Sequence, residues 1–172
     1  MASKATKPAA KKATGSARTD PATKLLMADH KEVHAMFQQY KKLADADAEA
    51  SEREALATEI CHALTVHATI EEELFYPAAR EAEVDADLLD EAEVEHASAK
   101  ALIAQIEAMS PDDALYDAKV TVLGEYIDHH VKEEEGELFP KCRKSDMDLE
   151  GIGEALATRK QALTAEMAEM AS

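Results

Sequence analysis

Two short segments of the chain repeat one arrangement of histidine, glutamate and proline. In each, a Glu stands four residues after a His and a Pro stands ten residues after it; the segments are His67–Pro77 and His130–Pro140. Residues four apart on a helix lie on the same face, so each segment points an imidazole and a carboxylate in one direction. These are common ligands of transition metals. The chain therefore offers the same pair of metal ligands twice.

Each repeated segment is preceded by a histidine that follows an acidic residue. Asp29-His30 stands 37 residues before the first His-x-x-x-Glu pair, and Glu95-His96 stands 34 residues before the second, counted from histidine to histidine. The sequence around Asp29-His30 resembles that around Glu95-His96. The chain thus looks like two copies of a helix pair, each with one lone His and one His-x-x-x-Glu helix.

The candidate ligands occupy helix positions where an apolar side chain is expected. Val120, Leu123 and Ile127 form a stripe that continues into the second pair, and Leu56 and Ile60 do the same for the first. Unpaired ionisable groups in a core are costly. Metal ions account for them, because cations neutralise carboxylates and take imidazole lone pairs. The predicted metal ligands are His30, His67, Glu71, His96, His130 and Glu134.

Each part of this pattern also has a plainer interpretation. A lone histidine on a buried face is more often a hydrogen-bonded core residue, and a single His-x-x-x-Glu pair arises by chance in a chain rich in Glu. Two copies with the same Pro spacing favour metal binding over chance. The alternative register His129-x-x-x-Glu133 faces away from the apolar stripe, so we assign it to the surface.

Other polar residues near the pairs receive lesser roles. His34, one turn after His30, could be an added ligand, but a core position or a supporting hydrogen bond is favoured; His62 is expected on a helix flank. The tyrosines are expected mainly to pack, although proton or electron transfer is open to them: Tyr40, Tyr76, Tyr116 and Tyr126. Further acidic residues are assigned to a solvated face: Glu72, Glu73, Glu133, Glu135 and Glu137.

The composition indicates an all-α protein. Hydrophobic residues make up 46% of the 172 residues, with only five Gly, five Pro and no Trp, which leaves few turn formers and few strand-type runs. No apolar run is long enough to span a membrane. The start of the chain lacks the apolar core of a secretory signal, so we expect a cytoplasmic protein. Cys61 and Cys142 are too few and too far apart for a disulfide framework or a thiolate zinc site.

The helical periodicity predicts four long helices and a shorter fifth. A capping box at Ser51–Glu54 should start the second helix, and Ser110 with Pro111 should start the fourth. Pro77 and the Gly136–Pro140 stretch should end the second and fourth helices. Short connections indicate an up-down-up-down four-helix bundle. The expected helices are 21–43, 51 to about 80, 86–109, 111–135 and 149–168.

The charge of the chain is divided unevenly. The net charge is −17, yet residues 1–24 carry +5, which leaves −22 on the remainder. Such an acidic body argues against nucleic acid as its ligand, because phosphates would be repelled. Residues 1–20 hold no large apolar residue after Met1 and are predicted to be a disordered basic tail, with at most weak contact to a polyanion.

The motif set resembles the hemerythrin-like family, also called the HHE cation-binding domain. The resemblance covers about residues 21–142 and includes the Leu-Phe-Tyr-Pro77 and Leu-Phe-Pro140 endings. It implies a four-helix bundle around two non-haem iron ions, oxo- or hydroxo-bridged, with residues 143–172 as a C-terminal helix packed on or extending from the bundle. The four histidines would be terminal ligands, and Glu71 and Glu134 would bridge the irons.

One position departs from the oxygen-carrying members of that family. They have a fifth histidine one turn after the third-helix ligand, where this chain has Lys100. The leading hypothesis is therefore a di-iron protein that binds O2, NO or peroxide in sensing, scavenging or stress response. One alternative is an enzyme that reduces NO or peroxide, or that donates iron for iron–sulfur centre repair. Another is iron storage or a structural metal, including Zn or Mn.

Overall fold

The computed structural model describes residues 20–170, and all the regular structure in that part of the chain is helical. The predicted tail, residues 1–20, falls almost wholly outside this range. The elements in chain order are α1 (Pro21–Asp45), α2 (Ala50–Ile70), the π-helical segment η1 (Glu71–Phe75), α3 (Tyr76–Glu81), α4 (Ala86–Glu107), α5 (Tyr116–Glu133), the π-helical segment η2 (Glu134–Leu138), α6 (Phe139–Lys144) and α7 (Leu149–Met170).

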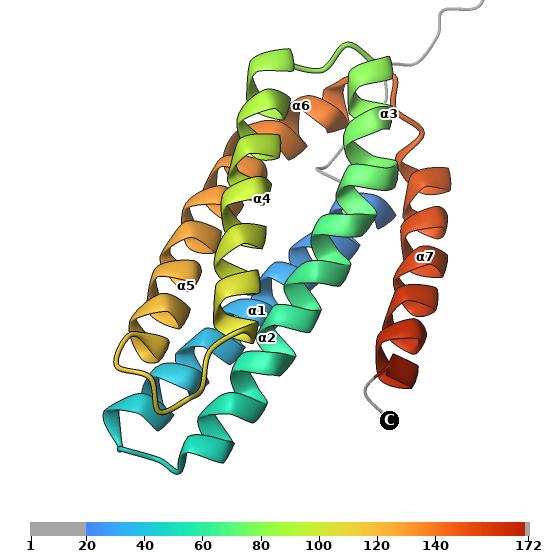
Figure 1. Cartoon of the computed structure of the whole chain (residues 1–172). Helices are drawn as coiled ribbons and strands as arrows, with labels where there is room; N and C mark the ends of the chain where they lie inside the picture. Colours follow the sequence, from blue (N-terminus) through green and yellow to red (C-terminus); the bar gives the residue numbers. More distant parts are fainter. Residues whose placement is uncertain (1–19, 171–172) are drawn as a thin grey trace, which may run out of the picture.

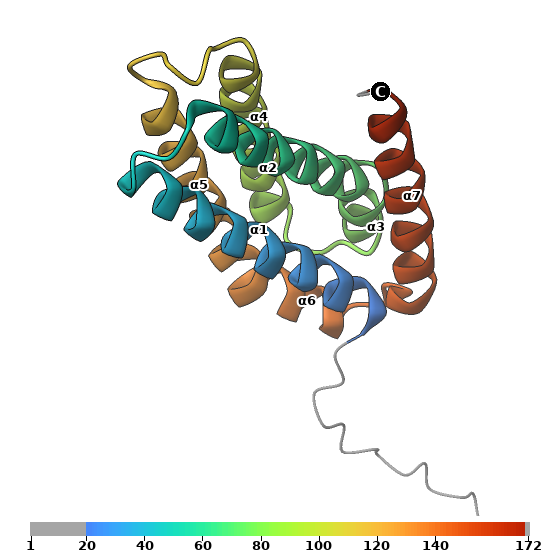
Figure 2. The same ribbon diagram turned by 90° about the horizontal axis from the view of Figure 1, so that it is seen from below.

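Four long helical rods form the bundle that the periodicity predicts (Figure 1). The rods are α1, α2 with α3, α4, and α5 with α6; α1 packs on α2 and α5, and α4 packs on α5 and α2. The all-α bundle fold is thereby confirmed. α7 lies along the outer side of the bundle against α1 and α2 (Figure 2). No described helix is long and apolar enough to cross a membrane.

The prolines of the repeated segments lie inside their helical rods. The second rod ends at Glu81, close to the predicted end at about 80, whereas the fourth runs past Gly136 and Pro140 to Lys144, contrary to the prediction. The second rod runs on from α2 through η1 into α3, and the fourth from α5 through η2 into α6 (Figure 1). Pro77 and Pro140 lie in the first turn of α3 and α6. A wider π turn before a proline shifts the hydrogen-bonding register, so the missing N–H costs little there. Gly136 lies inside η2 and leaves the rod unbroken.

The second helix begins within one residue of its predicted start, but its predicted cap and the predicted start of the fourth helix are wrong. α2 begins at Ala50 without a side-chain cap, so the Ser51–Glu54 capping box does not form. α5 begins only at Tyr116. Ser110 makes a local turn instead, in which its backbone N–H donates to Asp113 Oδ2 at 2.9 Å. Short polar side chains favour such turns as readily as helix caps, so the sequence pattern fits both.

The core consists of two apolar clusters with a polar layer between them. One cluster surrounds Phe75, Phe139 and Leu156, and the other surrounds Ile60 and Leu123. Eight polar residues are buried, and all but Thr23, which lies near the start of α1, lie between the clusters along the rods: Thr23, Asp29, His30, His67, Glu71, His96, His130 and Glu134. Seven of these are titratable groups, so the layer needs charge compensation that the apolar clusters cannot give.

α7 approaches α1 most closely at Gly153. A Cβ added there would lie 2.7 Å from Pro21 Cβ and 2.8 Å from the backbone nitrogen of Ala22. We therefore expect Gly153→Ala to lower the free energy of unfolding by about 1–3 kcal/mol, as overpacking does. Urea unfolding followed by circular dichroism measures this.

Gly136→Ala is the matched control for Gly153→Ala. A Cβ at Gly136 would have no neighbour within 4 Å, so the helix propensity of Ala should leave the stability equal or slightly higher. Equal stability of the Gly153→Ala protein and the wild type would contradict close packing of α7 on α1.

Candidate metal centre

The polar layer contains two clusters of possible ligand atoms that share a carboxylate. Cluster A consists of His30, His67, Glu71 and Glu134. The Nε2 atoms of His30 and His67 lie 3.1 Å apart. Each faces a carboxylate oxygen at 3.2 Å: Glu71 Oε1 for His67 and Glu134 Oε2 for His30. The cluster thus joins α1, α2 and the first residues of both π segments.

Cluster B consists of Glu71, His96 and His130. The Nε2 atoms of its two histidines also lie 3.1 Å apart. Glu71 Oε2 lies 3.3 Å from His96 Nε2, and Glu134 Oε2 lies 3.5 Å from His130 Nε2. Both carboxylates therefore lie against imidazoles of both clusters. The structure brings all six sequence-predicted ligands together, from two helix pairs far apart in the chain.

Each imidazole is oriented by a carboxylate on its outer nitrogen. The Nδ1 atoms of His30 and His96 bond to Glu135 at 2.8 Å and to Glu72 at 2.9 Å. Glu72 and Glu135 are thus more than the solvated acids that the sequence pattern predicted. The acidic residues that precede His30 and His96 bond to the other two rings. Asp29 lies 3.3 Å from His67 Nδ1, and Glu95 lies 2.6 Å from His130 Nδ1.

The donor set fits a pair of metal ions. An ionised carboxylate can only accept, so the four outer carboxylates place a proton on Nδ1, and a neutral ring then turns its Nε2 lone pair inward. Glu71 Oε1 and Glu134 Oε2 are buried and have no hydrogen-bond partner among the described residues. Lone pairs and carboxylate oxygens that face one another at about 3 Å repel unless cations lie between them.

Comparison with known proteins assigns the chain to a family. The family model for the hemerythrin HHE cation-binding domain matches residues 22–142. The chain belongs to the hemerythrin HHE family. A crystal structure of an HHE cation-binding domain-containing protein from Mycobacterium kansasii superposes with a TM-score of 0.69 over 87% of this chain and 90% of that one. At 23% identity, that likeness concerns the fold.

A curated relative shares only the domain-sized part of its length. It is a protein of Nostoc sp. named a DNA nickase, 30% identical over 117 residues. These residues are 68% of this chain but 32% of that protein, so the name describes a much longer molecule. The match leaves the activity of this HHE domain open.

Two lysines pair with the outer carboxylates of the HHE centre. Lys160 Nζ on α7 lies 2.5 Å from Asp29 Oδ1, and Lys100 Nζ lies 2.5 Å from Glu72 Oε2. Lys100 thus reaches His96 through Glu72. Burial opposes ionisation of Asp29, but His67 and Lys160 lower its pKa. Lys100 and His96 likewise lower the pKa of Glu72 against the effect of burial.

The remaining histidines of the described chain lie outside both clusters. His34 is exposed and bonds to Asp128 at 3.0 Å and to Gln38 at 2.8 Å, so the core or supporting role favoured from sequence is wrong. His129 is 66% exposed and contacts Glu133 at 3.3 Å, as expected for the surface register. His62 is half-buried on a flank of α2. Four histidines therefore face the centre.

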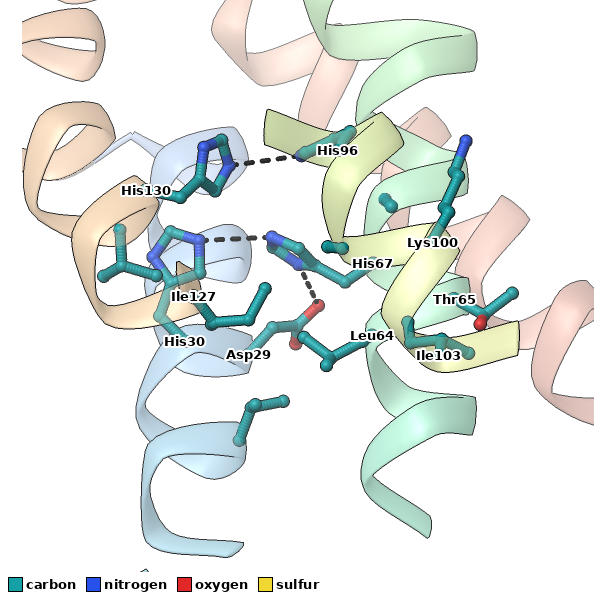
Figure 3. Close-up of a pocket in the computed structure, with 14 residues that line it drawn as sticks. Asp29, His30, Leu64, Thr65, His67, His96, Lys100, Ile103, Ile127 and His130 are labelled. Atoms are coloured by element: carbon teal, nitrogen blue, oxygen red, sulfur yellow. Dashed lines mark hydrogen bonds and ion pairs between the residues drawn. The ribbon is translucent and has the colours of Figure 1, made fainter. Parts of the chain in front are cut away.

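A small cavity lies against the four inward-facing imidazoles (Figure 3). Its volume is about 30 Å³, enough for a water or a diatomic molecule. Apart from the histidines, its wall is largely aliphatic: Val33, Leu64, Ala68, Ala99, Ile103, Ile127 and Val131. Asp29, Thr65 and Lys100 complete the lining. A small uncharged ligand suits such a space better than a charged or bulky one.

Protons compete with a metal for the imidazoles. Burial alone would lower the pKa of His67, but the charge of Glu71 and the hydrogen bond with Asp29 raise it to about 10. Burial would also lower the pKa of His130. Two interactions, the charge of Glu134 and the hydrogen bond to Glu95, instead raise this pKa to about 9. The charge of His67 holds the pKa of Glu71 well below its usual range, against the effect of burial.

These shifts predict how the metal-free protein responds to pH. A raised pKa in the folded state contributes stability that is complete below the ordinary value of 6.5 and is lost as pH rises to about 9–10. Urea unfolding of chelator-treated protein should show stability falling between pH 6.5 and 10. Metal affinity should rise over the same interval, because binding displaces those protons.

The variant His67→Ala with His130→Ala is the control for this pH dependence. It should lose most of the fall in stability between pH 6.5 and 10, since the two shifted groups are gone. An equal slope in the wild type and this variant would assign the pH dependence to other groups.

Proposed function

We propose that this HHE protein holds two non-haem iron ions and binds O2, NO or peroxide at them, in sensing, scavenging or stress response. The observation that carries the proposal is the pairing of two buried ligand clusters with a small aliphatic cavity against their four imidazoles. Imidazole with carboxylate is a ligand set that suits iron, and iron supplies reversible electron transfer to the small ligand.

The charges of the centre favour two divalent cations. Six carboxylates surround or orient the imidazoles: Asp29, Glu71, Glu72, Glu95, Glu134 and Glu135. Lys100 and Lys160 contribute two positive charges. Two divalent cations then make the whole group neutral. The compensation matters most for Glu71 and Glu134, which are 0% and 2% exposed, because an uncompensated buried charge carries a large desolvation penalty.

The chain's own residues prepare the site for a small ligand. The outer carboxylates fix each ring so that its inner nitrogen faces the metal, which reduces rearrangement on binding. The aliphatic wall restricts water near the imidazoles. No described side chain other than Asp29, Thr65, Lys100 and the histidines brings a polar group to the cavity. The site therefore favours binding of a diatomic molecule over chemistry that needs a dedicated acid on the substrate.

Iron content and ligand binding together test the proposal. We expect the wild type, purified from cells grown with balanced metals, to contain two irons per chain by elemental analysis. The anaerobically reduced protein should change its visible absorption when O2 or NO is added. His67→Ala with His130→Ala should abolish iron binding, because each cluster loses one imidazole.

His129→Ala with Glu133→Ala is the matched control for metal binding. It removes a His-x-x-x-Glu pair with the same spacing as His130 and Glu134. This pair is shifted by one residue along the chain and lies on the surface. This variant should retain both irons. Two irons in the His67/His130 variant, zinc or manganese in place of iron in the wild type, or iron-loaded protein inert to O2, NO and peroxide would each contradict the proposal.

The cavity gives a separate prediction. Ala99 is buried and lines it, so Ala99→Leu should fill much of the space of about 30 Å³. We expect the NO affinity of the reduced iron protein to fall at least roughly tenfold, or about 1.4 kcal/mol, with iron content unchanged. The control is Ala97→Leu, on the exposed face of the same helix. Equal NO affinity in the two variants would place the ligand elsewhere.

A further inference from the structure

The two halves of the centre differ in the aromatic residue that precedes the proline. The residue before the proline of each repeated segment is Tyr76 in the first half and Phe139 in the second. Both directly follow a π segment and are almost fully buried. The Phe139 ring stacks on His30 at 5.9 Å, and the Tyr76 ring lies against His96 at 5.3 Å between centroids. The repeat therefore places the rings equivalently and leaves the phenol oxygen as the difference.

The phenol oxygen of Tyr76 lies among the ligand atoms of cluster B. It is 2.7 Å from Glu134 Oε1 and 3.3 Å from Glu71 Oε2. It is also 3.2 Å from His96 Nε2 and 3.4 Å from His130 Nε2. The sequence predicted that Tyr76 mainly packs. Packing does not explain why its hydroxyl oxygen faces four ligand atoms. On the cluster A side, Phe139 presents only carbon.

Hydrogen bonding alone leaves this arrangement poorly satisfied. A phenol has one proton, and Glu134 Oε1 at 2.7 Å receives it. The three other neighbours of the oxygen are a carboxylate oxygen and two imidazole nitrogens, which carry inward lone pairs when the rings are neutral. Donor atoms bound to one metal by bonds of about 2.1 Å are separated by roughly 3.0–3.4 Å in octahedral or tetrahedral geometry. The three distances of 3.2–3.4 Å from the phenol oxygen to Glu71, His96 and His130 match the spacing of a shared coordination sphere, and the 2.7 Å distance to Glu134 is that of the hydrogen bond.

We propose that the phenolate oxygen of Tyr76 is a ligand of the metal in cluster B, which makes the two metals inequivalent. The inference rests on the proposed pair of metal ions. Binding exchanges the phenol O–H bond for an oxygen–metal bond and releases the proton to solvent. Glu71 and Glu134 both face imidazoles of both clusters, so each metal has two imidazoles and two shared carboxylates, and Tyr76 gives the metal of cluster B five protein donors against four at cluster A. The small exogenous ligand consequently binds at the metal of cluster A, beside His30 and His67.

A spectroscopic signature distinguishes this role from packing or hydrogen bonding. Phenolate bound to iron(III) gives a visible charge-transfer band, and excitation in that band enhances the tyrosine ring vibrations in the Raman spectrum. We expect both in the oxidised, iron-loaded wild type. Tyr76→Phe should lose both and retain two irons, because the six ligands of the two clusters remain and Phe139 shows that a phenyl ring fits the equivalent position.

Tyr40→Phe is the control for the tyrosine signal. Tyr40 is also buried, but its hydroxyl donates to Asp117 at 2.6 Å, away from both clusters, so its removal should leave the band intact. Ring-deuterated tyrosine in the wild-type chain should shift the enhanced vibrations, which tests the ligand even if Tyr76→Phe fails to fold.

The outcomes separate this inference from the proposed function. Two irons in the wild type without a tyrosine-dependent band would overturn the ligand role of Tyr76 and leave the di-iron centre standing. A band that persists in Tyr76→Phe would do the same. A wild type that binds no iron would overturn both.

Discussion

The burial of carboxylates and imidazoles in one layer of the bundle is the constraint on which the rest depends. Glu71 and Glu134 are 0% and 2% exposed, and each has an oxygen without a hydrogen-bond partner in the described chain. Apolar packing above and below cannot offset such groups. Cations between the clusters can. The apolar clusters hold the rods in place, while the polar layer determines what the protein can bind.

The π segments connect this electrostatic requirement to the backbone. Each begins at a glutamate of the centre and ends before a residue that carries an aromatic ring to the same layer: Tyr76 after η1 and Phe139 after η2. A π turn rotates the residues that follow it relative to a regular helix. One segment can therefore present a carboxylate and, five residues later, a ring to the same centre. The following proline is accommodated because it lies in the first turn of the next α-helical stretch.

The centre is a repeat with specific asymmetries. Outer carboxylates orient the rings in the same pattern in both halves, but Lys160 reaches only Asp29, and Lys100 reaches only Glu72. α7 thus contacts the centre on one side only, where Lys160 bonds to Asp29 and Asp29 in turn bonds to His67. The hydroxyl of Tyr76 gives a further difference, at the other cluster. Two metals in a nearly symmetric bundle can in this way differ in coordination, which would restrict the small ligand to one of them.

The sequence by itself determined the all-α bundle, the helix pairing and the six inward-facing residues, because 3.6-residue periodicity fixes which side chains share a face. Helix ends were less determined: Ser110 and the two prolines each fit more than one local conformation. Only the tertiary structure decided that Glu72 and Glu135 orient rings, that His34 faces solvent and that the Tyr76 oxygen lies at cluster B. Those outcomes depend on contacts between helices and on the turn added by each π segment, and neither is encoded in the spacing of residues along one helix.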